Sequence, residues 1–284
     1  MILQRTARTV ENVPLADRTF RIRLDCPEVA AAIRPGQFLM LRLPGTSDPL
    51  LGRPFALYDT VLDAGGTPIG LDVVYLVVGK MTGLLAALKS NEPVEVWGPL
   101  GNGFPDLSDH IVCVAGGIGQ TPFLAYARQL LGTRGYGGDT RRQRAKTVTL
   151  YYGVRTATLA AGVDDFRSAG CDVRLASDDG SLGTKGFVTQ LLAADRPAGP
   201  FVGCGPEPML HALAKLTAGW GAKCYVSLET PMACGFGACF SCVTKVKTPG
   251  GWDYKRVCVD GPVFDSWAVE WDARRSQRSE NEVL

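Results

Sequence analysis

The chain has 284 residues, of which 46% are apolar, and its 30 basic and 28 acidic side chains leave a formal charge of +2. This length and composition suit about two domains with proper cores plus a small module, which excludes disordered and fibrous classes. Charges of both signs are interleaved without a basic, aromatic-rich face, so nucleic acid is not an expected partner.

The amino-terminal residues place charge where a secretory signal needs an apolar core, at Arg5 and Arg8. No apolar run approaches the length that spans a bilayer, so no membrane partner is expected. Nine cysteines without an export signal fit a reducing compartment in which thiolates bind metal. The sequence therefore predicts a cytoplasmic protein.

Residues 1–105 are predicted to form an antiparallel β-barrel. Short alternating or β-branched runs, bounded by Gly, Pro or Asp, recur at a spacing typical of barrel strands. One helix, Thr82–Lys89, is expected among them. The predicted strands include Thr19–Leu24, Gln37–Arg42, Leu71–Val78 and Val94–Trp97.

Two segments of this predicted barrel suit a flavin nucleotide. Arg53 offers a planar guanidinium to a phosphate, and the aromatic side chains Phe55 and Tyr58 can flank a flat ring. Thr82, at the expected start of the helix, places a hydroxyl and backbone amides toward a second anion. For the first segment, an ordinary strand with a surface arginine is an equally good interpretation.

Residues 106–222 are predicted to form a parallel α/β domain that binds a nucleotide. The apolar strand Ile111–Ala115 leads into the glycine turn Gly116–Pro122 and the helix Phe123–Leu131. With Thr121 as N-cap and Pro122 as first helical residue, the free amides would face a dinucleotide pyrophosphate. Alternatively the glycines only permit a sharp turn, because the motif is not G-x-G-x-x-G. Later strands are expected at Thr147–Tyr152, Asp172–Ala176 and Pro200–Gly203.

A second glycine turn, Gly203–Met209, follows the last of these strands. Both turns should lie at the carboxyl edge of the sheet, where ligands bind, which places Cys204 beside a nicotinamide ring. Packing is the commoner role for a cysteine. Asp178 and Asp179 are expected to be turn residues. Arg155 is expected to be a solvated loop residue, with a contact to a ribose or 2′-phosphate as the alternative.

Three further features suggest no chemistry. The densest basic stretch, Arg134–Lys146, is rich in Gly and is expected to be a solvated loop, with a docking patch as the alternative. His110 and His211 are the only histidines, and neither has a sequence neighbour that marks a catalytic base.

Residues 223–284 are predicted to form a small iron–sulfur module. Cys234, Cys239, Cys242 and Cys258 have the C-x4-C-x2-C…C spacing of plant-type [2Fe–2S] ligands. The segment Val243–Val257 should form a hairpin that returns the fourth cysteine to the other three. Zinc is a weaker alternative, because structural zinc sites usually pair two C-x2-C knuckles and only one is present. Crowding of the thiols and the lack of a signal also disfavour disulfides.

The polar tail that follows the cluster module is expected to be frayed over Arg274–Glu280.

With these motifs in place, the chain resembles the ferredoxin-reductase-like flavoproteins and, within them, the electron-transfer subunits of class 1B dihydroorotate dehydrogenases. The resemblance covers nearly the whole chain. Its most specific parts are Met232–Cys242 and Arg256–Phe264, and Gly116–Pro122 and Cys204–Met209 agree in order and spacing. The implied cofactors are FAD, a [2Fe–2S] cluster and NAD.

The resemblance also implies a role for each matching position, and it implies no catalytic acid or base. Ala56 stands where a hydroxyl residue often faces the flavin, which removes one expected hydrogen bond to the ring. FAD is expected on Arg53, Pro54, Phe55, Ala56, Tyr75, Leu76, Val77, Met81 and Thr82. The nicotinamide cleft is expected on Gly116, Gly117, Gly119, Gln120, Thr121, Cys204, Gly205 and Pro206.

The implied function is electron transfer in pyrimidine biosynthesis. Dihydroorotate would be oxidised on an FMN-containing catalytic subunit, in a heterotetramer, and electrons would pass through the cluster and FAD to NAD⁺. Two other functions stay open, since one fold serves different chemistries. One is a subunit of an NAD(P)H:ferredoxin or sulfide oxidoreductase, and the other is a zinc-stapled interaction module without enzymatic activity.

Overall fold

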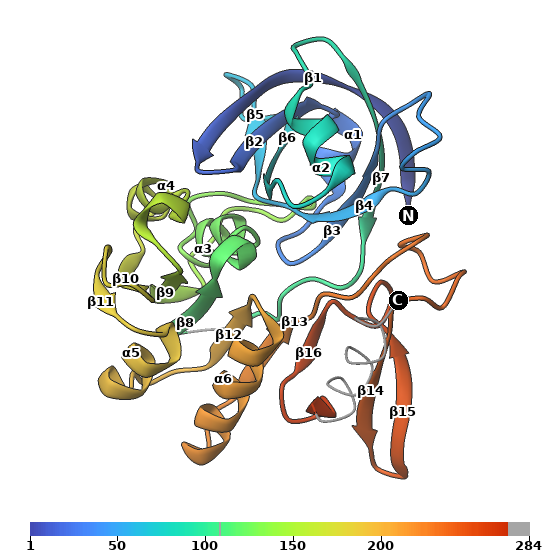
Figure 1. Ribbon diagram of the computed structural model, residues 1–284. Helices are drawn as coiled ribbons and strands as arrows, with labels where there is room; N and C mark the ends of the chain where they lie inside the picture. Colours follow the sequence, from blue (N-terminus) through green and yellow to red (C-terminus); the bar gives the residue numbers. More distant parts are fainter. Residues whose placement is uncertain (108, 272–284) are drawn as a thin grey trace.

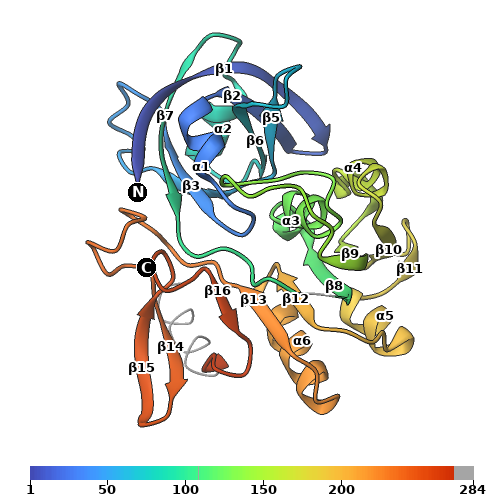
Figure 2. The same ribbon diagram turned by 180° about the vertical axis from the view of Figure 1, so that it is seen from behind.

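In a computed structural model, which describes residues 1–107 and 109–271, the chain forms a curved antiparallel sheet, a parallel α/β domain and a small C-terminal module. Figure 1 shows the curved sheet at one end and the other two parts side by side below it, and Figure 2 shows the same arrangement from behind. This confirms the predicted fold class. Within the described part of the chain, no helix has the length and apolar character needed to cross a membrane.

The first sheet is a half-barrel in which every strand pairing is antiparallel, in the order β4-β3-β7-β1-β2-β6-β5. The strands that close on the core alternate inward apolar side chains, such as Ile22, Leu24 and Val96, with outward polar ones. The strands are β1 (Leu3–Ala16), β2 (Thr19–Asp25), β3 (Phe38–Arg42), β4 (Arg53–Ala56), β5 (Asp59–Leu62), β6 (Pro68–Leu76) and β7 (Pro93–Leu100).

Two short helices, α1 (Pro27–Ala32) and α2 (Lys80–Ala86), cover the half-barrel. The second begins earlier than the predicted Thr82–Lys89. The reason is local, because the Thr82 hydroxyl accepts hydrogen bonds from the amides of Val78 and Gly79, at 3.0 and 3.1 Å, and so closes the first turn.

The second sheet has the order β11-β10-β9-β8-β12-β13-β16 and is parallel except where β16 pairs with β13. Figure 1 shows α3 and α4 on the side toward the half-barrel, with α5 and α6 on the other. The strands are β8 (Asp109–Gly116), β9 (Ala145–Val154), β10 (Asp172–Ser177), β11 (Thr184–Lys185), β12 (Phe201–Cys204), β13 (Cys224–Ser227) and β16 (Val263–Asp265). The helices are α3 (Phe123–Leu130), α4 (Val163–Ser168), α5 (Val188–Asp195) and α6 (Glu207–Gly219), with 3-10 turns η1 (Gly117–Gln120) and η2 (Ala157–Leu159).

The C-terminal module carries the predicted hairpin, formed by β14 (Val243–Thr248) and β15 (Gly251–Arg256). Its last strand, β16, joins the edge of the parallel sheet, and β13, which the expected division assigns to the module, lies in that sheet. The division of the chain at residues 105 and 222 stays a prediction. The expected fraying of Arg274–Glu280 lies outside the described residues.

The basic, glycine-rich segment after α3 is not a solvated loop throughout, which corrects that prediction. Residues 138–143 are exposed, but Tyr136 is buried in the core of the half-barrel and Arg134 bonds to Asp59 and to the carbonyl of Thr60. The sequence shows the polar composition of this segment but not the distant acceptor that draws it inward.

Candidate functional site

A cavity of about 560 Å³ opens where the half-barrel, the parallel domain and the segment before the cluster loop meet. Most of its lining is apolar, which suits a flat, largely apolar ring system. Ten of the predicted cofactor-binding residues line it, namely Arg53, Pro54, Phe55, Ala56, Tyr75, Leu76, Met81, Thr82, Thr121 and Cys204. The predicted residues that do not line it are Val77, Gly116, Gly117, Gly119, Gln120, Gly205 and Pro206.

A rigid aromatic wall forms the half-barrel side of this cavity. Tyr75 stacks on Phe20 and meets Phe55 edge-on, with ring centroids 6.0 Å apart in both pairs. Its hydroxyl donates a hydrogen bond to Asn12 Oδ1 at 3.0 Å, and burial raises the pKa of Tyr75 to about 12. The ring is therefore neutral and fixed, as a cofactor platform requires.

Some polar side chains at the cavity mouth already bond to other groups of the protein. Arg53 Nη1 donates to the carbonyls of Leu51 and Gly52, at 2.9 and 3.1 Å, which holds the guanidinium at the rim. The Thr82 hydroxyl, expected to face an anion, instead accepts the amides of Val78 and Gly79 at the start of α2. Lys80 also lines the cavity and forms an ion pair with Asp48, so it adds a positive charge that the sequence analysis did not single out.

The glycine turn after β8 departs from the expected helix cap. Gly117 has φ +55°, and the 3-10 turn η1 comes between β8 and α3. Thr121 continues this turn with φ −56° and ψ −42°, and Pro122 is the N-cap of α3 without a side-chain cap bond. The prediction that Thr121 caps the helix is thus wrong, although Thr121 and Pro122 both line the cavity.

The glycines of this turn permit close approach to the turn after β12. A Cβ at Gly119 would lie 2.3 Å from the carbonyl oxygen of Cys204, and a Cβ at Gly116 would lie 2.8 Å from Pro206 Cδ. The two predicted turns therefore touch at the carboxyl edge of the sheet. Gly119 thus packs directly on the backbone of Cys204. The residues of the two turns that line the cavity are Ile118, Thr121, Pro122 and Cys204.

Cys204 is buried beside two groups that the sequence analysis missed, Ser227 and Glu229. Burial, reinforced by the charge of Glu229, raises the pKa of the Cys204 thiol well above its ordinary range, and a hydrogen bond with Ser227 offsets part of this. The thiol therefore stays protonated at neutral pH and is not a nucleophile.

The third wall of the cavity is the chain from the end of β13 to the cluster loop, and the sequence analysis missed it as a cofactor wall. Its position depends on the pairing of β13 with β12 and β16, which no local pattern reveals. The wall consists of Ser227, Leu228, Glu229, Thr230, Pro231 and Met232.

The four predicted ligand cysteines lie in two pairs. Cys242 and Cys258 are buried with their sulfur atoms 3.1 Å apart, and burial, then Cys242, raises the pKa of Cys258 to about 12. Cys239 is exposed, and hydrogen bonds from Ser241, then from Cys234, lower its pKa to about 6.

A [2Fe–2S] cluster takes four thiolates, two on each iron, which fits this pairing. Within residues 1–107 and 109–271, no three Cys, His, Asp or Glu side chains converge as the ligands of a single zinc ion would. The pairing of the four thiols is therefore the observation that fits a two-iron cluster.

Small residues and two anchors shape the cluster loop. A Cβ at Gly235, where φ is +80°, would lie 2.6 Å from Met40 Cγ. The Trp97 indole donates to the carbonyl of Cys234 at 2.9 Å, and Arg256 donates to the carbonyl of Gly237 at 3.0 Å. The first anchor comes from the half-barrel and the second from the hairpin, so the loop is held from both sides.

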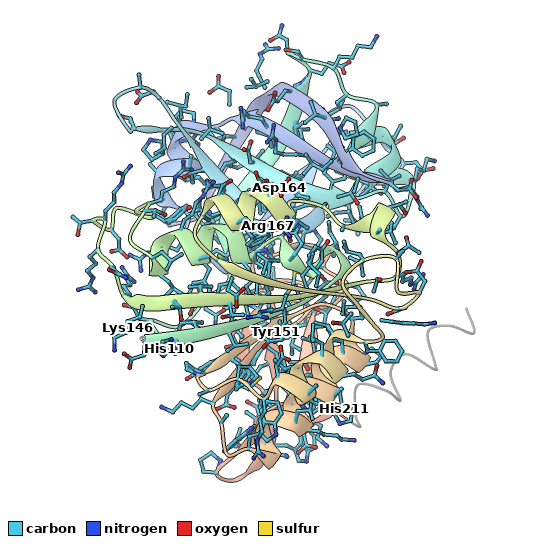
Figure 3. The ribbon with its side chains drawn as sticks, turned by 90° about the vertical axis from the view of Figure 1, so that its left-hand side faces the viewer. His110, Lys146, Tyr151, Asp164, Arg167 and His211 are labelled. Atoms are coloured by element: carbon cyan, nitrogen blue, oxygen red, sulfur yellow. The ribbon has the colours of Figure 1, made fainter. Side chains whose placement is uncertain are left out.

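Neither histidine is among the residues that line the cavity, and Figure 3 labels both. His110, at the start of β8, bonds to the Thr147 hydroxyl at 2.6 Å, and His211, on α6, stacks on Trp271 with ring centroids 5.4 Å apart. Asp179 accepts hydrogen bonds from Ser181 within a turn, as predicted.

Family models match two parts of the chain. Residues 229–270 match the iron-sulfur cluster binding domain of dihydroorotate dehydrogenase B, and residues 7–104 match the oxidoreductase FAD-binding domain.

The chain is similar to two curated proteins named dihydroorotate dehydrogenase B (NAD(+)), electron transfer subunit. That of Bacillus caldolyticus is 37% identical over 261 residues, which cover 90% of this chain and 94% of the relative. That of Desulforamulus reducens is 34% identical over 264 residues, which cover 91% and 95%. Among solved structures, an NADH-dependent reduced ferredoxin-NADP oxidoreductase studied for flavin-based electron bifurcation is 28% identical, with a TM-score of 0.80 over 96% of this chain and 93% of that one.

We predict that Gly119→Ala destabilises the protein, because the added Cβ would collide with the Cys204 carbonyl. Overpacking of this kind costs about 1–3 kcal/mol in the free energy of unfolding, measurable by urea denaturation. Gly83→Ala is the control, since nothing lies within 4 Å of the new Cβ and alanine favours a helix by up to about 1 kcal/mol. Equal stability of the two variants would contradict the close-approach argument.

We predict that Cys239→Ser abolishes the EPR signal of the reduced cluster while the flavin content per chain is unchanged, because one iron loses a thiolate. The control is Cys171→Ser, a buried core cysteine that follows α4 in the chain, which should keep the signal. A full signal in Cys239→Ser would exclude this residue as a ligand.

Proposed function

Because the chain belongs to the family of dihydroorotate dehydrogenase B electron-transfer subunits, we propose that it carries electrons from dihydroorotate, oxidised on an FMN-containing catalytic subunit, through a [2Fe–2S] cluster and FAD to NAD⁺. This places it in pyrimidine biosynthesis. The observation that carries the proposal is the cavity, whose three walls come from the FAD-binding half-barrel, the nucleotide turns and the chain leading to Cys234.

The proposed role of each lining residue follows from the wall to which it belongs. Tyr75, Phe55 and the backbone of β4 would hold the flavin ring, and the apolar lining would keep water from it. Thr121 and Cys204 face the same space from the parallel domain and would bound the nicotinamide. The bound flavin supplies the exchange between two-electron hydride chemistry and one-electron transfer.

Only a short length of chain separates the cavity wall from the first predicted ligand cysteine. Met232 lines the cavity, and Cys234 follows two residues later. Two residues of extended chain span at most about 7 Å, so the first ligand lies close to the cavity wall. Electrons would therefore have a short path between cluster and flavin.

The partner would dock at the exposed edge of the cluster. Cys239 is exposed, and the neighbouring Phe236 and Phe240 are 50% and 61% exposed, so two aromatic side chains on the same loop are available to a partner. We propose a cytoplasmic heterotetramer of two such subunits and two FMN-containing subunits. All nine cysteines are free, in keeping with a reducing compartment.

A second candidate is a subunit of an NAD(P)H:ferredoxin oxidoreductase. It is favoured by the similarity over 96% of this chain to the NADH-dependent reduced ferredoxin-NADP oxidoreductase structure. The two candidates share both nucleotide sites and a cluster and differ in the partner.

We predict that Arg53→Ala releases FAD, because the guanidinium at the cavity rim would pair with a flavin phosphate. The measurement is flavin per chain after gel filtration, with a loss of about tenfold in affinity expected for one charge-assisted contact. Arg174→Ala is the control, an exposed arginine paired with Asp172 far from the cavity. Full FAD occupancy in Arg53→Ala would remove this residue from the site.

The proposed activity predicts that the chain co-purifies with an FMN-containing subunit and that the complex reduces NAD⁺ when dihydroorotate is added. The rate is followed by NADH absorbance under anaerobic conditions. Reduction of ferredoxin by NADPH or NADH, without any response to dihydroorotate, would favour the second candidate and contradict the first.

A further inference from the structure

A buried carboxylate outside the cofactor cavity joins the half-barrel to the parallel domain. Asp59, at the start of β5, is only 4% exposed. Its Oδ2 accepts hydrogen bonds from Arg128, on α3, and from Arg134, the latter at 2.8 Å. Its Oδ1 accepts the Tyr136 hydroxyl at 2.6 Å and the Thr60 amide at 2.8 Å. We name Asp59, Arg128, Arg134 and Tyr136 the interdomain latch.

The carboxylate at the centre of the latch is fully hydrogen-bonded. Both oxygens of Asp59 have two donors each, and the two arginine side chains are mostly buried, at 23% and 22% exposure. Burial, then the charge of Asp59, raises the pKa of Tyr136 well above its ordinary range, so that its hydroxyl remains a donor. Networks of this kind, fully satisfied in a low dielectric, fix one geometry and penalise the removal of any member.

Tyr58, the residue before Asp59, also bonds to the parallel domain. The amide of Ala125, on α3, donates to the Tyr58 carbonyl at 3.2 Å, and the Tyr58 hydroxyl donates to Asp165, on α4, at 2.5 Å. Figure 3 shows α4, marked by Asp164 and Arg167, directly beneath the strands of the half-barrel. The start of β5 is therefore held by both helices that face the half-barrel.

Along the sequence, Asp59 and Arg128 each lie only a few residues from a residue that lines the cavity. Asp59 follows β4, whose last residue, Ala56, lines the cavity on the flavin side. Arg128 lies on α3, which begins directly after Thr121 and Pro122, the lining residues on the nucleotide side. Fixing Asp59 to Arg128 therefore fixes the spacing of the two walls.

We propose that Asp59 is a positioning residue that sets the distance between flavin and nicotinamide by clamping α3 against β5. The inference rests on the proposed function for the identity of these two ligands. When NADH is the donor, a hydride with its two electrons passes from NADH to the flavin, which oxidises NADH to NAD⁺ and reduces the flavin. This step needs near-contact geometry, so a small change in wall spacing slows it strongly.

The first test compares Asp59→Asn with Asp72→Asn in the FAD-loaded chain. Asp72 is a matched control, 7% exposed and bound by both nitrogens of the Arg23 fork at 2.8 Å, but with its partner in the same half-barrel. The measurement is the limiting rate of flavin reduction by NADH in anaerobic stopped flow. We expect a fall of about 10- to 100-fold for Asp59→Asn and a rate within about twofold of wild type for Asp72→Asn. Flavin content and the reduced-cluster EPR signal should be unchanged in both.

The second test needs no nucleotide. Hydrogen–deuterium exchange of the peptide covering α3 (Phe123–Leu130) should be faster in Asp59→Asn than in Asp72→Asn, because the Ala125 amide loses its fixed acceptor. If NADH does not reduce the wild-type flavin, the proposed function fails, and this measurement still decides whether the latch joins the two domains.

A third variant keeps the proposal testable if Asp59→Asn does not fold. Arg134→Met leaves the Asp59–Arg128 pair balanced and should lower the limiting rate by about threefold or more, with faster α3 exchange. Wild-type rates in the variants that fold would overturn the proposal even if exchange is faster, because the latch would then be structural only.

Discussion

The hydrogen bond from the Trp97 indole to the carbonyl of Cys234, 2.9 Å long, holds the cluster loop against the half-barrel. Trp97 lies on β7, whose neighbours in the sheet are β3 and β1. The same loop continues back through Met232 into the cavity wall. One indole therefore helps fix the position of the first predicted cluster ligand relative to the cavity that we propose for the flavin, and the proposed electron path depends on that position.

The half-barrel, the parallel domain and the C-terminal module, which are distant in the sequence, meet at the cavity. The segment after β7 bonds to the C-terminal module, because Asn102 accepts the amide of Val263 at 3.0 Å and donates to its carbonyl at 2.9 Å. The strand β16 then joins the parallel sheet beside β13. On the far side of the cavity, the interdomain latch performs the corresponding role for the nucleotide turns. The cavity is thus held between the contacts of the cluster module and those around Asp59.

Local patterns allowed much of this arrangement to be predicted from the sequence. The spacing of four cysteines alone predicts the cluster ligands, and the turn residues after Cys242 predict the hairpin. The strands and the two glycine turns follow from hydrophobic runs and from the lack of side chains at Gly116 and Gly119. What the sequence did not reveal depends on long-range contacts. The inward path of Arg134 requires the buried Asp59, and the cavity wall from Ser227 to Met232 requires the pairing of β13. The helix cap assigned to Thr121 failed because the left-handed Gly117 opens a 3-10 turn first.

The central claim is that one chain holds both a flavin and a two-iron cluster. An anaerobic titration with dithionite, followed by visible absorption, tests this most directly. The account predicts uptake of about three electrons per chain, two by the flavin and one by the cluster, with bleaching of both chromophores. Uptake of about two electrons with flavin bleaching alone, in material reconstituted with iron and sulfide, would contradict it.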